Sequence, residues 1–326
     1  MLQSKVLNFI HALVAAFFIS STAALAQYPD KPIRLVVPFP PGGITDFVAR
    51  AVTPIASKQL GQVIVIENRA GVGGVLGTGQ VAESKPDGYT IMLGTISVLA
   101  INAALFSNLP YDPEKSFDML TLATRAPNVL VVYPEFDVKT VDDLIKYLKT
   151  NPDRVAFGNS GTGSSDHLST ELFWQKTGTR GVHVPFQGSG PSVTSLLGGH
   201  TQASFRNLAE VTAHIKGGGL RLIAVATDKR LTEFPDTPTL SETGVVGAEV
   251  YSWQGFVAPK GLSPDIRKKV HDALVYGLND AGVRKALADR GVEAVPSTPE
   301  EFAQFQRDEI VRWKAVVKAG NITGTR

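Results

Sequence analysis

The sequence predicts an α/β protein with two domains, each built on a parallel-rich sheet, and a ligand cleft between them. Two observations support this fold class. From Ile33 onward, short β-branched runs alternate with amphipathic stretches, which is the pattern of parallel strands joined by crossover helices. A second set of such runs begins near Asn128. Its strands are continuous apolar runs, as expected for strands covered on both faces.

The first set predicts three strands and a long helix. The strands are expected at 33–39, 63–68 and 89–93, and the helix at 46–60. Apolar residues recur at helical spacing along that helix. Pro54 lies inside it, where a proline is expected to kink or break the helix.

The second set predicts a second domain. A helix is expected to begin at Thr140, where Thr140 and Asp143 form a capping box. The remaining elements are strands at 129–134, 155–161, 182–186, 202–205 and 220–227, and helices at 165–175 and 190–199.

The C-terminal part predicts a strand near 253–261 and two helices with clear start signals. One helix begins at Ser263-Pro264 and the other at Thr298-Pro299, with Glu301 three residues after the threonine. These helices have no sheet of their own, so we expect the chain to return to the first domain. The expected boundaries are 27–126 plus 228–326 for domain 1 and 127–227 for domain 2.

Composition and charge are those of an ordinary globular protein. The 326-residue chain is 43% hydrophobic and 19% charged, with a net charge of +2, which allows a large core. No run of Lys or Arg stands out, so we expect neither nucleic acid nor an anionic membrane as the main partner. The chain has no cysteine, which excludes disulfides, lipid attachment and thiolate sites. We expect a monomer.

Residues 1–26 have the features of a secretory signal peptide. Lys5 gives a positive start, 6–19 is largely apolar, and Ala24-Leu25-Ala26 resembles a cleavage site before Gln27. The alternative is a membrane helix, but the apolar run is shorter than the roughly 20 residues that a span needs. We therefore expect a soluble periplasmic protein without a lipid anchor.

Three loops rich in glycine and hydroxyl groups each connect a strand to a helix, at 38–46, 158–167 and 185–192. Parallel geometry places them at the carboxyl ends of their strands, where α/β proteins bind ligands. The helix N-termini that follow offer free N–H groups to an anion, and glycine permits its close approach. The alternative is that each loop is only a turn with a cap, provided by Thr45, Ser164 and Ser189.

Several motifs together resemble the Bug (TctC-like) receptors, the periplasmic solute-binding proteins of tripartite tricarboxylate transporters. The stretches that carry the resemblance include "YPDKPIRLVVPFPPGGITDFVAR", "FGNSGTGSSDHLSTELF" and "VPFQGSGPSVTSLLGGH". The resemblance implies a type II periplasmic-binding-protein fold, a carboxylate ligand held between two lobes, and delivery to a membrane permease. It also implies that the carboxylate is gripped by Pro41, Gly42, Gly43, Thr45 and Asp46 and by Ser160, Gly161, Thr162, Gly163 and Ser164.

Further ligand-binding candidates come from the same motifs and strand ends. They are Phe39, Thr95, Ser97, Gln187, Gly188, Arg206 and Asn207. Phe39 and Phe186 either form an apolar wall for the ligand or belong to the core. Related receptors commonly carry an acid at the position of Arg206. An arginine there suits a second carboxylate, as in a dicarboxylate or aromatic dicarboxylate. Alternatively, Arg206 faces solvent or pairs with a nearby acid.

Two other function classes remain open at this stage. A periplasmic serine hydrolase is the enzyme alternative, because His167 follows Ser160 and Ser164 closely, but no G-x-S-x-G motif occurs. The stretch "GTGQVA" at 77–82 matches a dinucleotide-binding pattern only weakly. The histidines show no metal-ligand spacing, so we expect no metal, no cofactor and no catalytic residues. The second alternative to a transport receptor, besides the hydrolase, is a receptor that signals to a sensor protein.

Overall fold

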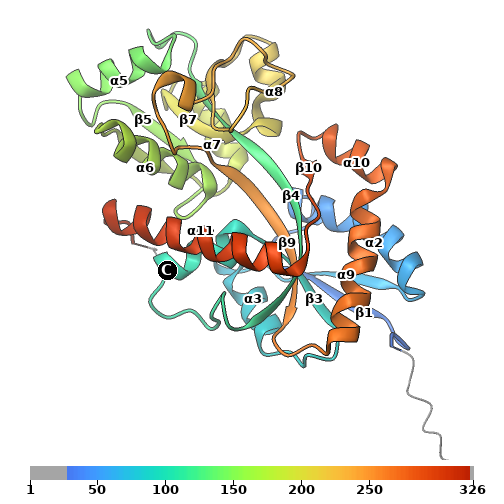
Figure 1. Cartoon of the computed structure of the whole chain (residues 1–326). Coiled ribbons are helices and arrows are strands. Elements are labelled where there is room, and N and C mark those ends of the chain that lie inside the picture. The colour runs from blue at the N-terminus through green and yellow to red at the C-terminus, as the bar shows by residue number, and fades with distance from the viewer. Residues whose placement is uncertain (1–27, 324–326) are drawn as a thin grey trace, which may run out of the picture.

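The structure, a computed structural model, describes residues 28–323 and consists of two α/β lobes that share one sheet (Figure 1). The predicted signal peptide lies outside the described residues. Within them, no helix is long and apolar enough to cross a membrane.

A ten-stranded sheet runs through both lobes in the order β2-β1-β3-β9-β4-β7-β5-β6, and β8 and β10 also pair with β4. The strands are β1 (Ile33–Val37), β2 (Ile64–Asn68), β3 (Thr90–Thr95), β4 (Phe117–Val132), β5 (Ala156–Asn159), β6 (Val182–Pro185), β7 (Ala203–Asn207), β8 (Arg221–Val225), β9 (Tyr251–Pro259) and β10 (Glu293–Ala294).

The first lobe is built on the parallel strands β2, β1 and β3, with β9 antiparallel to β3. Both faces of β1 are covered: Ile33 and Leu35 pack in the cluster beneath α2, whereas Val36 packs in the opposite cluster. This explains the apolar run without alternation. The predicted helix forms as α2 and continues through Pro54 without a break in the assigned helix. The helices of the first lobe are α2 (Ile44–Leu60), α3 (Val75–Ala82), α4 (Asn102–Leu105), α9 (Pro264–Asn279) and α10 (Ala281–Ala288).

Two tighter or wider helical turns complete the lobe. A 3-10 turn spans Val72–Gly74 directly before α3, and a π-helical turn spans Ser97–Ile101 directly before α4.

The second lobe is built on β6, β5 and β7, which run parallel, with β4 antiparallel to β7 and β8. The capping box predicted at Thr140 and Asp143 is present. The helices are α5 (Val141–Thr150), α6 (Ser165–Thr177), α7 (Ser189–Leu197) and α8 (Leu208–Lys216).

The long strand β4 joins the lobes. It pairs with β9 as far as Pro127 and with β7 from Asn128 onward. The sequence predicted only its second half, because a proline normally interrupts a strand. Here Pro127 stands where the pairing partner changes from one lobe to the other.

The return to the first lobe differs from the predicted boundary at 227. Leu240 N–H donates to Val225 O at 3.0 Å, and Val250 N–H donates to Ala226 O at 2.8 Å. The segment 228–250 therefore lies beside β8 in the second lobe, and it contains a short 3-10 helix, Ser241–Thr243. The chain returns as β9, which begins at Tyr251. Polar, proline-rich residues such as those at 235–244 resemble an interdomain linker even where they hydrogen-bond to a lobe.

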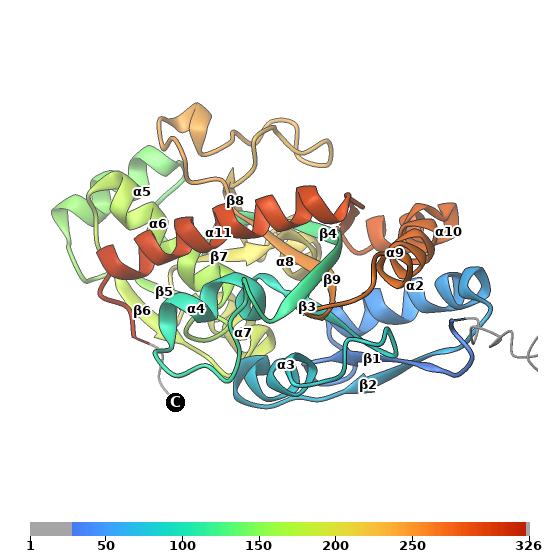
Figure 2. The ribbon, with the colours of Figure 1, turned by 60° about the horizontal axis from the view of Figure 1, so that its bottom comes forward.

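The C-terminal helices divide between the lobes. The predicted caps at Ser263 and Thr298 are present. α9 and α10 pack on α2, as expected, but α11 (Pro299–Ala319) packs on β4 and α4 and also on α6 of the second lobe (Figure 2). Gln175 Nε2 in α6 donates to Val316 O in α11 at 2.9 Å. The expectation that all of these helices belong to the first domain was therefore incomplete.

Candidate functional site

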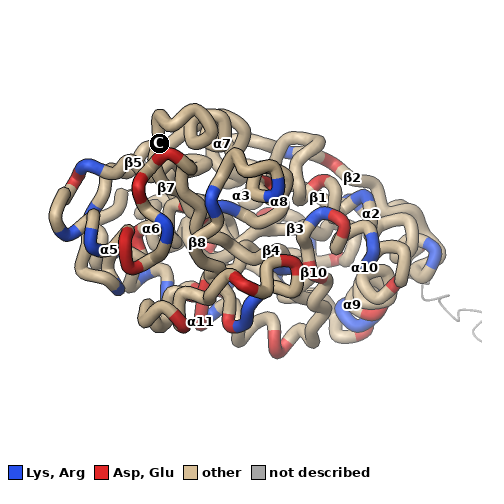
Figure 3. Tube along the Cα trace, turned by 90° about the horizontal axis from the view of Figure 1, so that it is seen from above, with Lys and Arg blue, Asp and Glu red and all other residues tan. Residues whose placement is uncertain are grey.

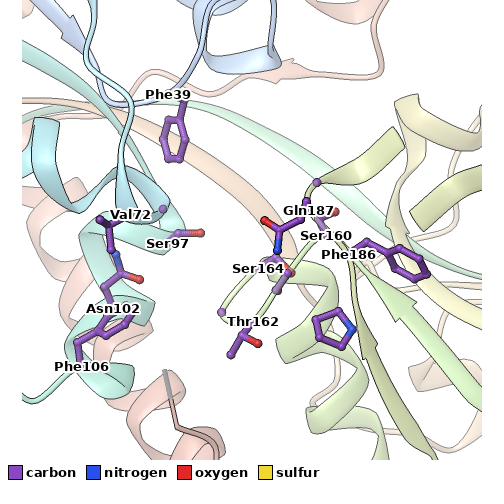
Figure 4. Close-up of a pocket in the computed structure, with 15 residues that line it drawn as sticks. Phe39, Val72, Ser97, Asn102, Phe106, Ser160, Thr162, Ser164, Phe186 and Gln187 are labelled. Carbon is purple, nitrogen blue, oxygen red and sulfur yellow. The ribbon is translucent and has the colours of Figure 1, made fainter. Parts of the chain in front are cut away.

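A cavity of about 600 Å³ opens between the two lobes. The first lobe contributes apolar groups and small polar groups, and the second contributes its two glycine-rich loops (Figure 4). The lining residues are Phe39, Val72, Gly73, Ser97, Asn102, Phe106, Ser160, Gly161, Thr162, Gly163, Ser164, Pro185, Phe186, Gln187 and Gly188.

None of these lining residues carries a charged side chain. Over the described chain, basic and acidic residues are interspersed on both lobes (Figure 3). Any charge on a ligand in this cavity is therefore met by neutral donors: backbone N–H groups, hydroxyls and amides. Such groups bind carboxylates well where helix N-termini point at the ligand.

The first-lobe loop is fixed by Asp46, in the first turn of α2. Its carboxylate accepts hydrogen bonds from Gly42 N–H at 3.0 Å, Arg50 Nε at 2.8 Å and Asn68 Nδ2 at 3.1 Å. The hydrogen bond from Arg50 is the main cause that lowers the pKa of Asp46 from 3.8 to about 2. Asp46 therefore shapes the loop from within and does not line the cavity.

The second-lobe loop is fixed in a similar way by Asp166, in the first turn of α6. Asp166 Oδ2 accepts from both the backbone N–H and the hydroxyl of Ser160, each at 2.8 Å. Gly163 N–H donates to His167 Nδ1 at 3.1 Å. Ser164 Oγ donates to Gly161 O at 2.5 Å. The turn at 160–164 is therefore held from within at both of its ends.

The third loop, at 185–192, is hydrogen-bonded to the second, at 158–167. Phe186 N–H donates to Asn159 O at 3.0 Å, and Gly188 N–H donates to Ser160 O at 3.2 Å. The helices after the three loops begin directly after the N-cap residues Gly43, Ser164 and Gly188. The two glycines have no side chain, and the Ser164 side chain accepts no hydrogen bond from its helix among the described residues. The alternative of simple capping by Thr45, Ser164 and Ser189 is therefore not what the structure contains.

The two phenylalanines differ. Figure 4 shows the Phe39 ring between the lobes, whereas the Phe186 ring is directed away from Phe39 and the first lobe. Phe39 also packs on the core and on Gly74. Phe39 thus lines the cavity and packs on the core, and a contact between Phe39 and a ligand stays a prediction.

Several predicted residues do not line this cavity. Pro41 and Gly42 are exposed at the outside of the loop, whereas Thr45 is buried behind it. Gly43 and Asn207 line a second interlobe cavity of about 500 Å³, together with Gln254 of β9. Thr95 lies opposite Gln254 in the sheet, and the Thr95 hydroxyl is buried without a hydrogen-bond partner among residues 28–323.

Arg206 pairs with acids of the protein, which was the alternative to a contact with a second ligand carboxylate. Its side chain is fully buried, and the guanidinium contacts Asp166 at 2.7 Å and also Glu210. A direct contact between Arg206 and a ligand stays a prediction, and the side chain does not line the cavity in this arrangement of the lobes.

Sequence reasoning did not select Val72, Gly73, Asn102, Phe106 and Pro185. Asn102 and Phe106 lie on or just after α4, in the stretch "INAALF", which contributes to the family resemblance but by itself indicates no binding role. Their position opposite the loop at 160–164 results from the packing of the lobes.

His167 is a structural residue. It is buried, and its ring stacks on the His183 ring with centroids 3.8 Å apart. Burial, followed by the neighbouring His167, lowers the pKa of His183 to about 4. Because His167 Nδ1 already accepts from Gly163, it is not positioned to activate a serine. The glycine pattern at 77–82 also has a packing role, since Gly77 in α3 lies against the Arg69 carbonyl.

Comparisons with known proteins identify the family to which this chain belongs. Residues 48–322 match the model of the tripartite tricarboxylate transporter family receptor. The chain belongs to this family. It is 37% identical over 317 residues to the protein BugT of Bordetella pertussis, covering 97% of each chain.

Two solved structures give the same result. One, described as a periplasmic transporter, has a TM-score of 0.80 and 41% identity, with 91% of this chain and 100% of the other covered. The other is R. palustris Rpa4515 with adipate, with a TM-score of 0.80, 34% identity, and 91% and 99% covered. These matches confirm the predicted periplasmic-binding-protein fold and a solute receptor, not an enzyme. The hydrolase alternative is therefore excluded.

Proposed function

We propose that this receptor binds a small organic carboxylate in the cavity between its lobes and delivers it to the membrane permease of a tripartite tricarboxylate-type transporter. The observation that carries the proposal is the cavity lining, in which helix N-termini without capping side chains and neutral donors surround the space. An anion is the ligand best suited to free N–H groups. After removal of the signal peptide, the protein would act in the periplasm.

The ligand class proposed is a dicarboxylate, aliphatic or aromatic. Two observations support it. The related Rpa4515 was solved with adipate, and the cavity combines apolar groups such as Phe106 with neutral donors such as Asn102 on the first-lobe side. One carboxylate would bind at the loop 160–164, the carbon chain would lie along the apolar groups, and the second carboxylate would accept from neutral donors.

A thermal-shift screen of the mature protein tests the proposal, using adipate, malate, terephthalate, hexanoate and the neutral diamide adipamide at one pH and ionic strength. A ligand at 100 times its dissociation constant adds about 2.7 kcal/mol to stability, which raises the melting temperature by a few degrees. We expect a shift with at least one carboxylate and none with adipamide.

Calorimetry on the carboxylate with the largest shift then gives its affinity, and chromatography after incubation shows whether it is returned unchanged. No shift with any carboxylate, or an equal shift with adipamide, would contradict carboxylate binding. Deletion of the gene should abolish uptake of the labelled ligand by cells. Unchanged uptake would contradict the delivery role.

A further inference from the structure

Three helices of the second lobe begin around one buried cation, Arg206 at the end of β7. Its Nη1 donates to Asp166 Oδ2 at 2.7 Å, to Ser160 Oγ at 3.2 Å and to Ser192 Oγ at 3.3 Å. Its Nη2 donates to Ser189 Oγ and to Glu210 Oε2. The partners therefore come from the starts of α6, α7 and α8. A planar guanidinium can join so many groups because its five N–H donors point in fixed directions.

These contacts reach the cavity lining directly at Ser160 and a second time through Asp166. Asp166, which Arg206 holds, accepts both donors of Ser160. Ser160 lines the cavity, and its carbonyl accepts from Gly188, another lining residue. The positions of the N–H groups in both second-lobe loops thus depend on a side chain that does not itself line the cavity.

Arg206 also determines the charge behind the loop. Asp166 is only 4% exposed and lies directly behind Ser160. Without a positive partner, its carboxylate would repel an anion bound at the loop, and low solvent access would leave that repulsion poorly screened. Arg206 offsets this charge at 2.7 Å, and its second carboxylate partner, Glu210, has a side chain that is 29% exposed, so water screens the remaining negative charge.

We propose that Arg206 is a positioning residue for anion binding: it fixes the two second-lobe loops in one geometry and offsets the buried charge of Asp166, so that a carboxylate can bind beside it. This inference rests on the proposed function, since it assumes an anionic ligand. It assigns Arg206 a role through the protein and not through contact with the ligand.

The experiment compares wild type with Arg206→Met, Arg206→Lys and the double variant Arg206→Met/Asp166→Asn. Binding of adipate and of hexanoate, a monocarboxylate of equal chain length, is measured by calorimetry. Arg206→Met should weaken both ligands by about tenfold or more, because hydrogen bonds to charged groups are worth about that much. The double variant also removes the buried charge of Asp166, which leaves only the partly exposed Glu210 uncompensated, and it should recover part of the affinity. Arg206→Lys keeps the charge with fewer donors and should lie in between.

A second measurement needs no ligand. Hydrogen exchange of the backbone amides at 160–164 and 186–189 is followed in the ligand-free protein, and Arg206→Met should increase it. The matched control is Arg221→Met, because Arg221 is a half-buried arginine of the same lobe that donates to the carbonyls of Phe136 and Val138, away from the loops. It should lower stability without changing loop exchange or affinity.

Each outcome decides the proposal. Unchanged loop exchange and unchanged affinity in Arg206→Met would overturn it, as would a double variant with no recovery. A loss of adipate binding with intact hexanoate binding would instead show a direct contact with a second carboxylate. If Arg206→Met does not fold, the Lys variant and the double variant carry the same comparison. If wild type binds no carboxylate, the proposed function fails, but the exchange experiment still decides whether Arg206 fixes the loops.

Discussion

The two loops that border the interlobe space are each held by an aspartate, but the arginines that pair with these aspartates differ. In each, an aspartate in the first turn of a helix turns back to accept a backbone N–H of the preceding loop, from Gly42 to Asp46 and from Ser160 to Asp166. The counter-ions differ. Arg50, on the same helix as Asp46, has a side chain that is 56% exposed, whereas the side chain of Arg206, on a neighbouring strand, is 0% exposed.

The different burial of the two arginines indicates which loop is held more rigidly. In the first-lobe pair Asp46 is buried but Arg50 lies in water on the same helix, so water can take the place of either partner and screens the pair. A buried pair between separate elements is costly to break, because removal of one partner leaves an uncompensated charge. The second-lobe loop is therefore the fixed side of the site, and the first-lobe loop, with Pro41 and Gly42 exposed, is the adaptable side. Three predictions test this contrast.

The largest effect is expected from removal of the two aspartates. Asp166→Ala should lower the free energy of unfolding by about 3 kcal/mol, because it leaves Arg206 and Ser160 without a shared buried acceptor. Asp46→Ala should cost less, since Arg50 can turn to water. Urea unfolding of both variants at pH 7 measures the difference. Equal losses would remove the distinction between a fixed loop and an adaptable loop.

The second effect concerns one glycine in each loop. Gly42 and Gly163 have φ values of +85° and +83°, so an alanine at either position costs about 1 kcal/mol of backbone strain. A Cβ at Gly42 meets nothing within 4 Å, but one at Gly163 would overlap Leu105 of the first lobe. Gly163→Ala should therefore also weaken carboxylate binding, by keeping the lobes apart.

The added variant Leu105→Ala should restore binding to Gly163→Ala while leaving its backbone strain in place. If Gly42→Ala and Gly163→Ala weaken binding equally, contact between the lobes at this point is not important for the ligand.

The smallest effect concerns pH. The folded-state pKa of Asp46, about 2, lies below its ordinary value of 3.8. The stabilisation from ionised Asp46 is thus fully present above the ordinary value and is lost as the pH falls towards 2. Wild type should lose more stability than Asp46→Asn between pH 5 and pH 2.5. Parallel losses in urea unfolding at these two pH values would contradict the assigned hydrogen bonds.

Local signals in the sequence account for much of the fold. The capping residues Thr140, Ser263 and Thr298 act as predicted, because a cap depends only on residues three or four positions away. The predictions differ from the structure where residues far apart in the chain determine strand pairing and lobe boundaries. Pro127 is compatible with a strand because its pairing changes there, and the segment 228–250 belongs beside β8 through hydrogen bonds that no local pattern reveals.

The sequence by itself determined the α/β class, the loops at strand ends and, through the resemblance of its motifs, the receptor family. These follow from periodicity, glycine placement and local chemistry. Only the tertiary structure decided which loop residues line the cavity, and that Asn102 and Phe106 join them from the first lobe. It also decided the environment of Arg206. A charged side chain takes the partners that three-dimensional packing brings within reach, and its acids lie 40 and 4 residues away along the chain.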